Sequence, residues 1–295
     1  MDNYVLSCCS TADLTREHLE KRNIKYICFH YSLDGKTYTD DLGQTMPLDE
    51  FYSAMTAGAE TKTAQINSEE YEKYFEEFLK SGKDVVHLTL SSGISGSYNS
   101  ALIAKNNLKD KYPDRNVFVV DSLGASSGYG LIMDKLADLR DEGYDAESLA
   151  KWAEEHKLEM HHWFFSTDLT FYVKGGRVSK TSGFVGNLLK ICPLLNMDDN
   201  GRLIPRYKIM GKKRVISAIV GKMLEFALNG TEYSENCFIS NSASPKDAEE
   251  VKKLVEEHFP NLKGKVKIFS IGTTIGSHTG PGTVALFFWG KRRDN

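Results

Sequence analysis

The sequence of 295 residues lacks the features that mark several classes of protein. No apolar run approaches the roughly 18 residues that a membrane-spanning helix needs. The first residues carry neither a basic segment nor a secretory apolar stretch, so we expect no signal peptide. The five cysteines are odd in number and have no paired metal-ligand spacing. We therefore expect reduced thiols in a cytoplasmic protein, not a disulfide scaffold or a zinc ribbon.

Neither sign of charge is in large excess. The 37 basic and 40 acidic residues give a net charge of −3. This balance argues against a nucleic-acid-binding protein, because such proteins usually present a basic face. The length predicts about two globular domains of roughly 100–200 residues each.

The first half of the chain alternates strand-like and helix-like stretches. Asn67 and Glu70 have the spacing of a capping box at the start of a helix, and Pro47 opens an earlier helix. Strands are expected over 4–8, 24–31, 84–90 and 116–121, and helices over 14–22, from 47 and over 68–80. Apolar strands that alternate with helices predict a doubly wound parallel sheet.

The second half has a different pattern. Asn200-Gly201 lies between two β-rich runs, 188–197 and 202–209, and is typical of a hairpin in which both turn residues have positive φ. Further strands are expected over 161–166, 236–240, 265–271 and 283–289, and helices over 214–228 and 245–258. The predicted fold is therefore α/β, with a parallel-sheet domain over 1–160 and an α+β domain with a mixed or antiparallel sheet over 161–295. We expect a ligand in the cleft between the domains.

A run of hydroxyls and glycines follows the strand 84–90. Ser91, Ser92, Ser95 and Ser97 lie where a parallel strand ends and a helix begins, which favours anion binding by hydroxyls and free backbone N–H groups. The same residues are equally compatible with a turn whose serines only cap the helix.

Three other stretches are candidates for binding. Thr63 precedes the capped helix, a common place for a threonine. Lys174 and Arg177 flank a Gly-Gly turn that suits an anion clamp, a partner contact or a solvated turn, and the stretch does not fit a Walker A motif. His278 lies in a glycine-rich loop. A histidine there either donates a hydrogen bond to a carboxylate or transfers a proton, or it only pairs with loop carbonyls.

Two other patterns suggest catalysis or metal binding. Gly124-Ala-Ser126-Ser-Gly128 matches G-x-S-x-G after a strand and leaves a serine hydrolase with Ser126 as nucleophile as an alternative, although its turn is longer than a sharp elbow. His161 and His162 are adjacent in a strand, so their side chains face opposite sides, and no third ligand has suitable spacing. We predict no metal site.

Five motifs, taken in order, resemble those of the DegV family of bacterial fatty-acid-binding proteins. Residues 10–13 resemble the family's D-S-T-A-D, with Cys9 at the first aspartate, and residues 63–67 resemble T-S-Q-P-S. Residues 91–98 resemble S-S-x-L-S-G-T-Y, residues 172–179 match Y-L-x-K-G-G-R-I-S, and residues 278–282 match H-x-G-P-G. The resemblance covers nearly the whole chain.

The resemblance implies a ligand-binding protein without catalysis or cofactor of its own. It would hold one long-chain fatty acid, such as palmitate or oleate, in a tunnel between two domains. A separate ATP-dependent kinase subunit would phosphorylate the carboxyl group, giving an acyl phosphate for phospholipid synthesis. By the same resemblance, Thr63 and Ser95 hydrogen-bond the carboxyl group, Ser92 lies nearby, and His278 lies beside it.

Apolar residues of both domains are expected to line the tail. The candidates are Phe164, Phe165, Phe184, Val185, Leu188, Leu189, Ile191 and Leu195, each of which is equally explicable as core.

Departures from the family pattern bear on the kinase partner. Cys9 replaces an aspartate, Ala64 lacks the serine hydroxyl, and Met210 stands where family members often have an arginine. Arg177, Arg206 and Arg214 are the partner-facing candidates. A standalone lipid carrier or sensor is the alternative within this class.

Overall fold

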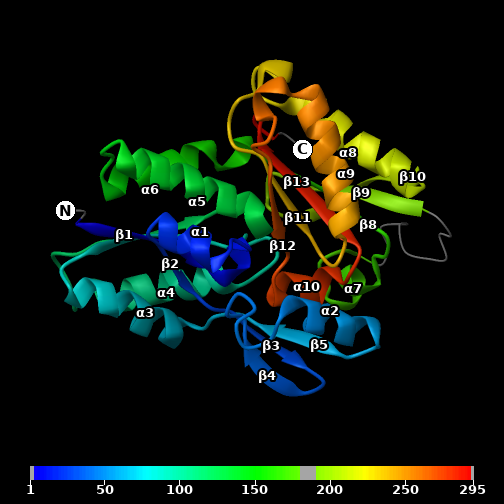
Figure 1. The fold of residues 1–295 in the computed structure, drawn as a ribbon. Helices are drawn as coiled ribbons and strands as arrows, with labels where there is room; N and C mark the ends of the chain where they lie inside the picture. The colour runs from blue at the N-terminus through cyan, green and yellow to red at the C-terminus, as the bar shows by residue number, and fades with distance from the viewer. Residues whose placement is uncertain (1–2, 180–190, 294–295) are drawn as a thin grey trace.

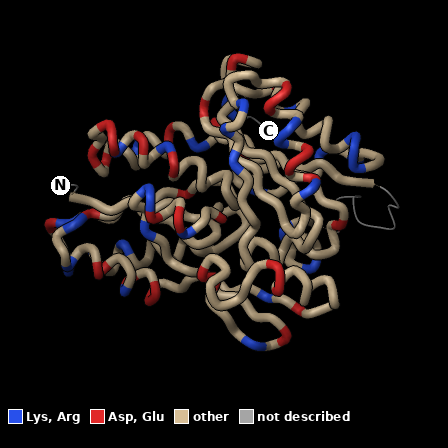
Figure 2. The backbone as a smooth tube through the Cα atoms, viewed as in Figure 1, with Lys and Arg blue, Asp and Glu red and all other residues tan. Residues whose placement is uncertain are grey.

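A computed structural model describes residues 3–179 and 191–293 of the chain. Its strands form three sheets, and the two larger ones lie side by side with helices around them (Figure 1). Basic and acidic residues are interspersed over both halves (Figure 2). In the described part of the chain, no helix combines the length and the apolar character needed to cross a membrane.

The first sheet is parallel and doubly wound, as predicted. Its strand order is β2 (Ile24–Ile27), β1 (Tyr4–Cys9), β6 (Asp84–Thr89) and β7 (Val117–Asp121). Helices α3 (Ser68–Lys80) and α4 (Ser97–Lys109) pack together on one face, whereas α5 (Ser126–Asp141) and α6 (Ala146–His156) cover the other (Figure 1). Helix α1 (Arg16–Lys21) packs against β2. Strand β6 is buried almost throughout because helices cover both of its faces.

The second sheet is mixed, again as predicted. Its order is β10 (Leu203–Met210), β9 (Ile191–Met197), β8 (Met160–Ser166), β13 (Thr283–Trp289), β11 (Phe238–Asn241) and β12 (Lys267–Ser270), and only β11 and β12 run parallel among these strands. Helices α8 (Lys212–Phe226) and α9 (Pro245–His258) pack on its outer face. Helix α5 contacts strands of both large sheets and is buried along most of its length. Although β8 begins at Met160, the domain boundary at 160/161 stays a prediction.

The small third sheet was not predicted. Its strands are β4 (Lys36–Thr39), β3 (His30–Leu33) and β5 (Thr61–Ala64), and α2 (Leu48–Thr56) lies beside them. The single β-run expected over 24–31 was wrong, because the chain leaves the first sheet after Ile27 and re-enters a different one at His30. Helices α7 (Thr170–Lys174) and α10 (Thr273–Thr279) come from the second half of the chain, and α10 packs on this small sheet.

Local sequence patterns explain where several elements begin. The Asn67 side chain accepts from the Glu70 N–H, and the Glu70 carboxylate accepts from the Asn67 N–H, so the capping box is confirmed. The hairpin is present, but its turn differs from the expected one. Gly201 has φ of +68° and Asn200 does not lie in the positive-φ region. The Asp198 carboxylate accepts from the N–H of Asn200 and of Arg202, which stabilises a longer loop.

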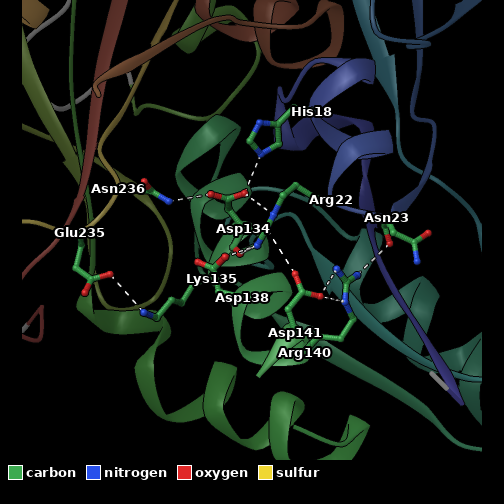
Figure 3. A network of polar contacts seen from close by, with 10 residues as sticks. All are labelled: His18, Arg22, Asn23, Asp134, Lys135, Asp138, Arg140, Asp141, Glu235 and Asn236. Atoms are coloured by element: carbon green, nitrogen blue, oxygen red, sulfur yellow. Dashed lines mark hydrogen bonds and ion pairs between the residues drawn. The ribbon is translucent and has the colours of Figure 1, made fainter. Parts of the chain in front are cut away.

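A buried carboxylate links the two large sheets. Asp134 of α5 accepts hydrogen bonds from His18 Nε2 at 2.8 Å and from Asn236 Nδ2 at 3.0 Å, and Arg22 Nε lies 3.2 Å away (Figure 3). Burial would raise the pKa of Asp134, but the bond and charge of His18, with Lys267 and Arg22 nearby, leave this pKa lowered. The network therefore favours an ionised carboxylate between α1, α5 and the loop before β11.

Asp134→Asn is expected to lower the free energy of unfolding by about 2 kcal/mol at pH 7, because it removes the buried charge that His18 and Arg22 share, although Arg22 keeps its ion pairs with Asp138 and Asp141. A carboxyl group whose pKa is lower in the folded protein stabilises the fold above its unfolded pKa and loses this effect as pH falls through its folded pKa. The difference between wild type and variant in urea unfolding should therefore shrink below about pH 4.

Asp141→Asn is the matched control. This carboxylate is 55% exposed and lies 3.6 Å from Arg22, so its loss should cost no more than about 1 kcal/mol. Equal effects of the two substitutions would contradict the account of the network.

Candidate functional site

A cavity of about 320 Å³ lies between the inner face of the second sheet and the turns that follow β6 and β7. This volume is at the lower end of the usual range for ligand pockets. Most of its wall is apolar: Phe29, Leu90, Ile94, Ala125, Phe164, Met197, Leu203, Ile271, Ile275, Ala285 and Phe287. An apolar wall of this kind suits a hydrocarbon group.

Three of the predicted binding residues meet at one part of this cavity. Thr63 of β5, Ser95 of the turn before α4 and His278 of α10 all line it. Thr63 Oγ1 lies 2.7 Å from His278 Nε2, although the residues are 215 positions apart. The sequence motifs thus converge in space, and we refer to Thr63, Ser95 and His278 as the polar end of the cavity.

Buried hydrogen bonds fix α10, and with it His278, against the first half of the chain. Tyr52 Oη donates to the Ile271 carbonyl at 2.8 Å, and the Gly272 N–H donates to Asp13 at 2.9 Å. Thr273 Oγ1 donates to Asp40, also at 2.9 Å. These bonds join the segment before and at the start of α10 to elements of the first half.

His278 is a neutral histidine at pH 7. Burial, followed by the positive charge of Arg177, lowers the pKa of His278 to about 4. Its Nδ1 is buried against Gly175 and has no hydrogen-bond partner among residues 3–179 and 191–293. Since an unpaired buried N–H is costly, the proton belongs on Nε2, which then donates to Thr63 Oγ1.

Both hydroxyls of the polar end therefore have a hydrogen to donate. Thr63 Oγ1 accepts from His278, and Ser95 Oγ accepts from the Ser97 N–H at 3.2 Å. Each hydroxyl hydrogen is left to donate to a ligand oxygen. The first N–H groups of α4 lie beside Ser95 and add to the preference for a negatively charged group.

The predicted residues outside this group have separate positions. Ser92 is exposed and is not among the lining residues; its N–H donates to Asp121 at 3.1 Å. Arg206 donates to Asn196 Oδ1 at 2.8 Å within the β9–β10 hairpin, and Arg214 lies in a surface groove beside α9. The structure therefore does not bring Ser92, Arg206 or Arg214 to the cavity.

Arg177, predicted to face a partner, lines the cavity. Its guanidinium donates to the carbonyls of Ile94 at 3.2 Å and Gly175 at 2.5 Å, and burial lowers its pKa. It also lines an adjoining outer groove of about 350 Å³, together with Lys62, Lys174, Thr63 and His278. The polar end thus lies between the apolar cavity and a surface groove that carries basic side chains.

None of the three departures from the family motifs, Cys9, Ala64 and Met210, is among the residues that line the cavity. Cys9 is buried in the first sheet, where Sγ lies 3.2 Å from Tyr71 Oη and 3.7 Å from His87 Nε2, and burial raises its pKa to about 11. Met210, at the end of β10, is 60% exposed.

The predicted tail-lining residues divide by strand alternation. Phe164 lines the cavity, whereas Phe165, its neighbour on β8, is buried on the other face. Ile191 and Leu195 are not among the lining residues. Phe184, Val185, Leu188 and Leu189 lie outside the described residues. Gln65 and His162 also line the cavity, and neither was predicted to be a binding residue. Gln65 lies two residues after Thr63 in the same motif.

Ser126 lines the cavity but lacks the partner that a hydrolase needs. Its hydroxyl donates to Asp13 at 2.5 Å and lies 3.2 Å from Ser240 Oγ, and in the described part of the chain no histidine hydrogen-bonds to it. Its φ is +55°. The described residues also contain no cluster of three His, Cys, Asp or Glu side chains that would hold a metal ion.

Comparisons with known proteins agree with these motifs. The sequence model of the family described as "Uncharacterised protein, DegV family" matches residues 9–291. A DegV domain-containing protein of Clostridium perfringens is 33% identical over 294 residues, covering 100% of both chains. A Thermotoga maritima protein, whose structure is reported to reveal a fatty acid binding function, is 28% identical with a TM-score of 0.83 and covers 98% of this chain and 100% of its own.

A more distant structure has the same fold. The B3 protein of the Streptococcus pneumoniae fatty acid kinase, loaded with linoleic acid, is 22% identical, with a TM-score of 0.83 and coverage of 98% and 99%. The two-sheet α/β fold class predicted from the sequence is confirmed.

The tautomer of His278 is directly measurable. In protein with ¹⁵N-labelled histidine, we expect Nε2 of His278 to stay protonated and Nδ1 unprotonated between about pH 5 and about pH 8, because its folded pKa lies below this range. His278→Gln assigns the resonance. A proton on Nδ1, or an imidazolium at pH 7, would contradict the arrangement of donors at the polar end.

Proposed function

The chain belongs to the DegV family, and we propose that it binds a long-chain fatty acid, with the carboxyl group at the polar end and the hydrocarbon chain in the cavity. The observation that carries this proposal is that Thr63, Ser95 and His278 all line one cavity whose wall is largely apolar, with Thr63 and His278 in hydrogen-bond contact. The fatty acid binding function reported for the Thermotoga maritima relative supports it.

The polar end suits a carboxylate because it offers donors. The hydroxyl hydrogens of Thr63 and Ser95 and the N-terminus of α4 all carry partial positive charge, and all lie at the polar end. Arg177 is the one lysine or arginine among the described residues that line the cavity, and its guanidinium donates to the backbone carbonyls of Ile94 and Gly175. The carboxylate is thereby oriented without a tight ion pair. Its oxygen is then a better nucleophile than that of a carboxylate paired with an arginine, because no cation stabilises its negative charge.

The hydrocarbon chain supplies most of the affinity. At about 0.8 kcal/mol per buried CH₂ group, a long acyl chain gains on the order of 10 kcal/mol before the cost of ordering is subtracted. Phe164, Ala285 and Phe287 line the wall along which the chain would lie.

We further propose that the protein presents the carboxyl group to a separate, ATP-binding kinase subunit in the cytoplasm. The outer groove is lined by the same Thr63–His278 pair. Glu60 also lines this groove and pairs with Lys174 at 3.1 Å, but Lys62 and Arg177 leave the groove with an excess of positive charge that suits a phosphoryl group. The resemblance to acyl-carrying subunits of bacterial fatty acid kinases supports this role. All five cysteines are free thiols, which is consistent with the reducing cytoplasm. The product would be an acyl phosphate for phospholipid synthesis.

The combined change Thr63→Val and Ser95→Ala tests the binding site. It removes two charge-assisted hydrogen bonds and keeps side-chain volume nearly constant, so the affinity for palmitate should fall about 100-fold or more. Native mass spectrometry of protein purified from a bacterial host, followed by displacement titration, measures the loss. Ser92→Ala is the matched control, because Ser92 is exposed and outside the lining. Unchanged palmitate affinity in a folded double variant would refute the assignment.

The kinase role has its own test. Loaded protein is incubated with ATP and hydroxylamine, which converts an acyl phosphate to a hydroxamate, with and without a purified fatty acid kinase subunit. Hydroxamate is expected only with both proteins, and Lys62→Ala with Lys174→Ala should slow its formation several-fold by removing charge from the groove. Loaded protein that yields no hydroxamate with the kinase would instead indicate a standalone carrier or sensor.

A further inference from the structure

Part of the cavity wall belongs to the hairpin of β9 and β10. Met197, the last residue of β9, pairs with Leu203, the first residue of β10, and both side chains line the cavity. Strand β10 is an edge strand of the second sheet, so among the described residues the hairpin has a neighbouring strand on one side only. The position of this wall therefore depends on what holds the hairpin loop, residues 198–202.

The hairpin loop packs closely on the two turns that form the opposite wall. A Cβ atom at Gly93, in the turn after β6, would lie 2.4 Å from the Asn200 carbonyl oxygen, and one at Gly201 would lie 3.0 Å from Leu123 Cα, in the turn after β7. The Ser91 hydroxyl donates to the Gly201 carbonyl at 2.8 Å. The same turns carry the lining residues Leu90, Ile94 and Ala125. The contact of loop and turns thus sets the spacing between the two walls.

The side chain of Arg293 joins the hairpin loop to the turn after β7. Its guanidinium donates to the carbonyls of Met197 at 3.2 Å, Asp198 at 3.0 Å and Leu123 at 3.1 Å. The backbone N–H of Arg293 donates to the Leu158 carbonyl at 2.8 Å, just before β8. One residue therefore connects both walls of the cavity to the start of β8.

The guanidinium carries its charge into the interior. Arg293 is 4% exposed. Burial lowers its pKa to about 10, and the negative charges of Asp198 and Asp199 in the hairpin loop oppose this shift, so the group is protonated at pH 7. A buried charge is costly unless it keeps its hydrogen bonds, and the bonds that it donates are stronger than those of neutral donors. The hairpin loop is therefore held in one position relative to the turn after β7.

This wall faces the alkyl part of the proposed ligand. Strand β13 leaves the polar end at Thr283, which follows the His278 loop, and Phe287 lies roughly 14 Å further along the strand. The registers of β8 with β13 and with β9 place Met197 in the same row of the sheet as Phe287. The hairpin wall therefore lies away from the carboxylate, beside the middle of a long acyl chain.

We propose that Arg293 determines which acyl chains fit: by holding the hairpin wall against the two turns, it limits the cavity to chains without a mid-chain branch. Arg293 is not itself among the lining residues, so it is a positioning residue that acts through Met197 and Leu203. This inference rests on the proposed function and adds to it the class of acyl chain. Because the cavity of about 320 Å³ is small for a ligand pocket, a methyl group beside the chain has to displace a wall.

Matched acids test the proposal. Delipidated protein is equilibrated with octadecanoic acid and with its 2-methyl, 8-methyl, 10-methyl or 12-methyl derivative, and bound species are quantified by native mass spectrometry. The wild type is expected to bind at least one mid-chain methyl acid about 10-fold more weakly than octadecanoic acid, the cost of one misplaced methyl group in an apolar pocket. Arg293→Met, which keeps a long side chain without donors, should reduce this ratio several-fold. The ratio for the 2-methyl acid, whose branch lies at the polar end, should not change.

Two milder variants act on the same contact if Arg293→Met does not fold. Ser91→Ala removes the hydrogen bond to Gly201, and Gly201→Ala adds a methyl group that would lie 2.0 Å from Ser91 Oγ and so displaces the loop. Both should lower the mid-chain ratio as Arg293→Met does. Arg140→Met is the matched control, because the Arg140 side chain is 8% exposed and donates to the Asn23 carbonyl, away from the cavity lining (Figure 3). Thermal melting shows which variants are folded.

The outcomes separate this inference from the proposed function. An unchanged mid-chain ratio in folded Arg293→Met, or in both milder variants where Arg293→Met does not fold, overturns the inference alone. So does a wild type that binds every mid-chain methyl acid as well as octadecanoic acid, or an equal fall of the ratio in Arg140→Met. Failure of all the acids to bind the wild type overturns the proposed function and this inference with it.

Discussion

A carboxylate that leaves water needs hydrogen-bond donors, and an alkyl chain that leaves water needs an apolar wall. The cavity offers both, with the hydroxyls of Thr63 and Ser95 and the imidazole of His278 in a wall that is otherwise largely apolar. The protonation of His278 decides whether this arrangement works. Because the proton sits on Nε2 and is directed at Thr63, the threonine hydroxyl is free to donate outward.

The site exists only where the two halves of the chain meet. Thr63 and Ser95 come from the first half, whereas His278, Phe164 and Phe287 come from the second. Their relative positions depend on buried polar contacts that cross between the halves. These include Asp134 with Asn236 and Asp13 with Gly272 (Figure 3 shows the first). Such bonds are costly to break when buried, and they hold the donors in a fixed geometry.

Short-range patterns in the sequence predicted much of the fold. The apolar run at β6, the capping box at Asn67 and the Asn-Gly hairpin each determine structure within a few residues, and all three elements are present. The strand β5 was not predicted, because its Thr-Lys-Thr-Ala sequence is short and has no apolar alternation; pairing with β3 makes it a strand. Ser92 and Ser95 cannot be distinguished by their sequence context. The conformation of the turn leaves Ser92 exposed and places Ser95 in the cavity wall.

A crystal structure of the protein purified with its natural ligand tests the central claim most directly. The account predicts continuous density for a long acyl chain, with its carboxylate oxygens within hydrogen-bond distance of Thr63 Oγ1 and Ser95 Oγ and its chain running past Phe164 toward Phe287. A carboxylate bound elsewhere on the protein, or a cavity filled by the protein's own side chains, would contradict it.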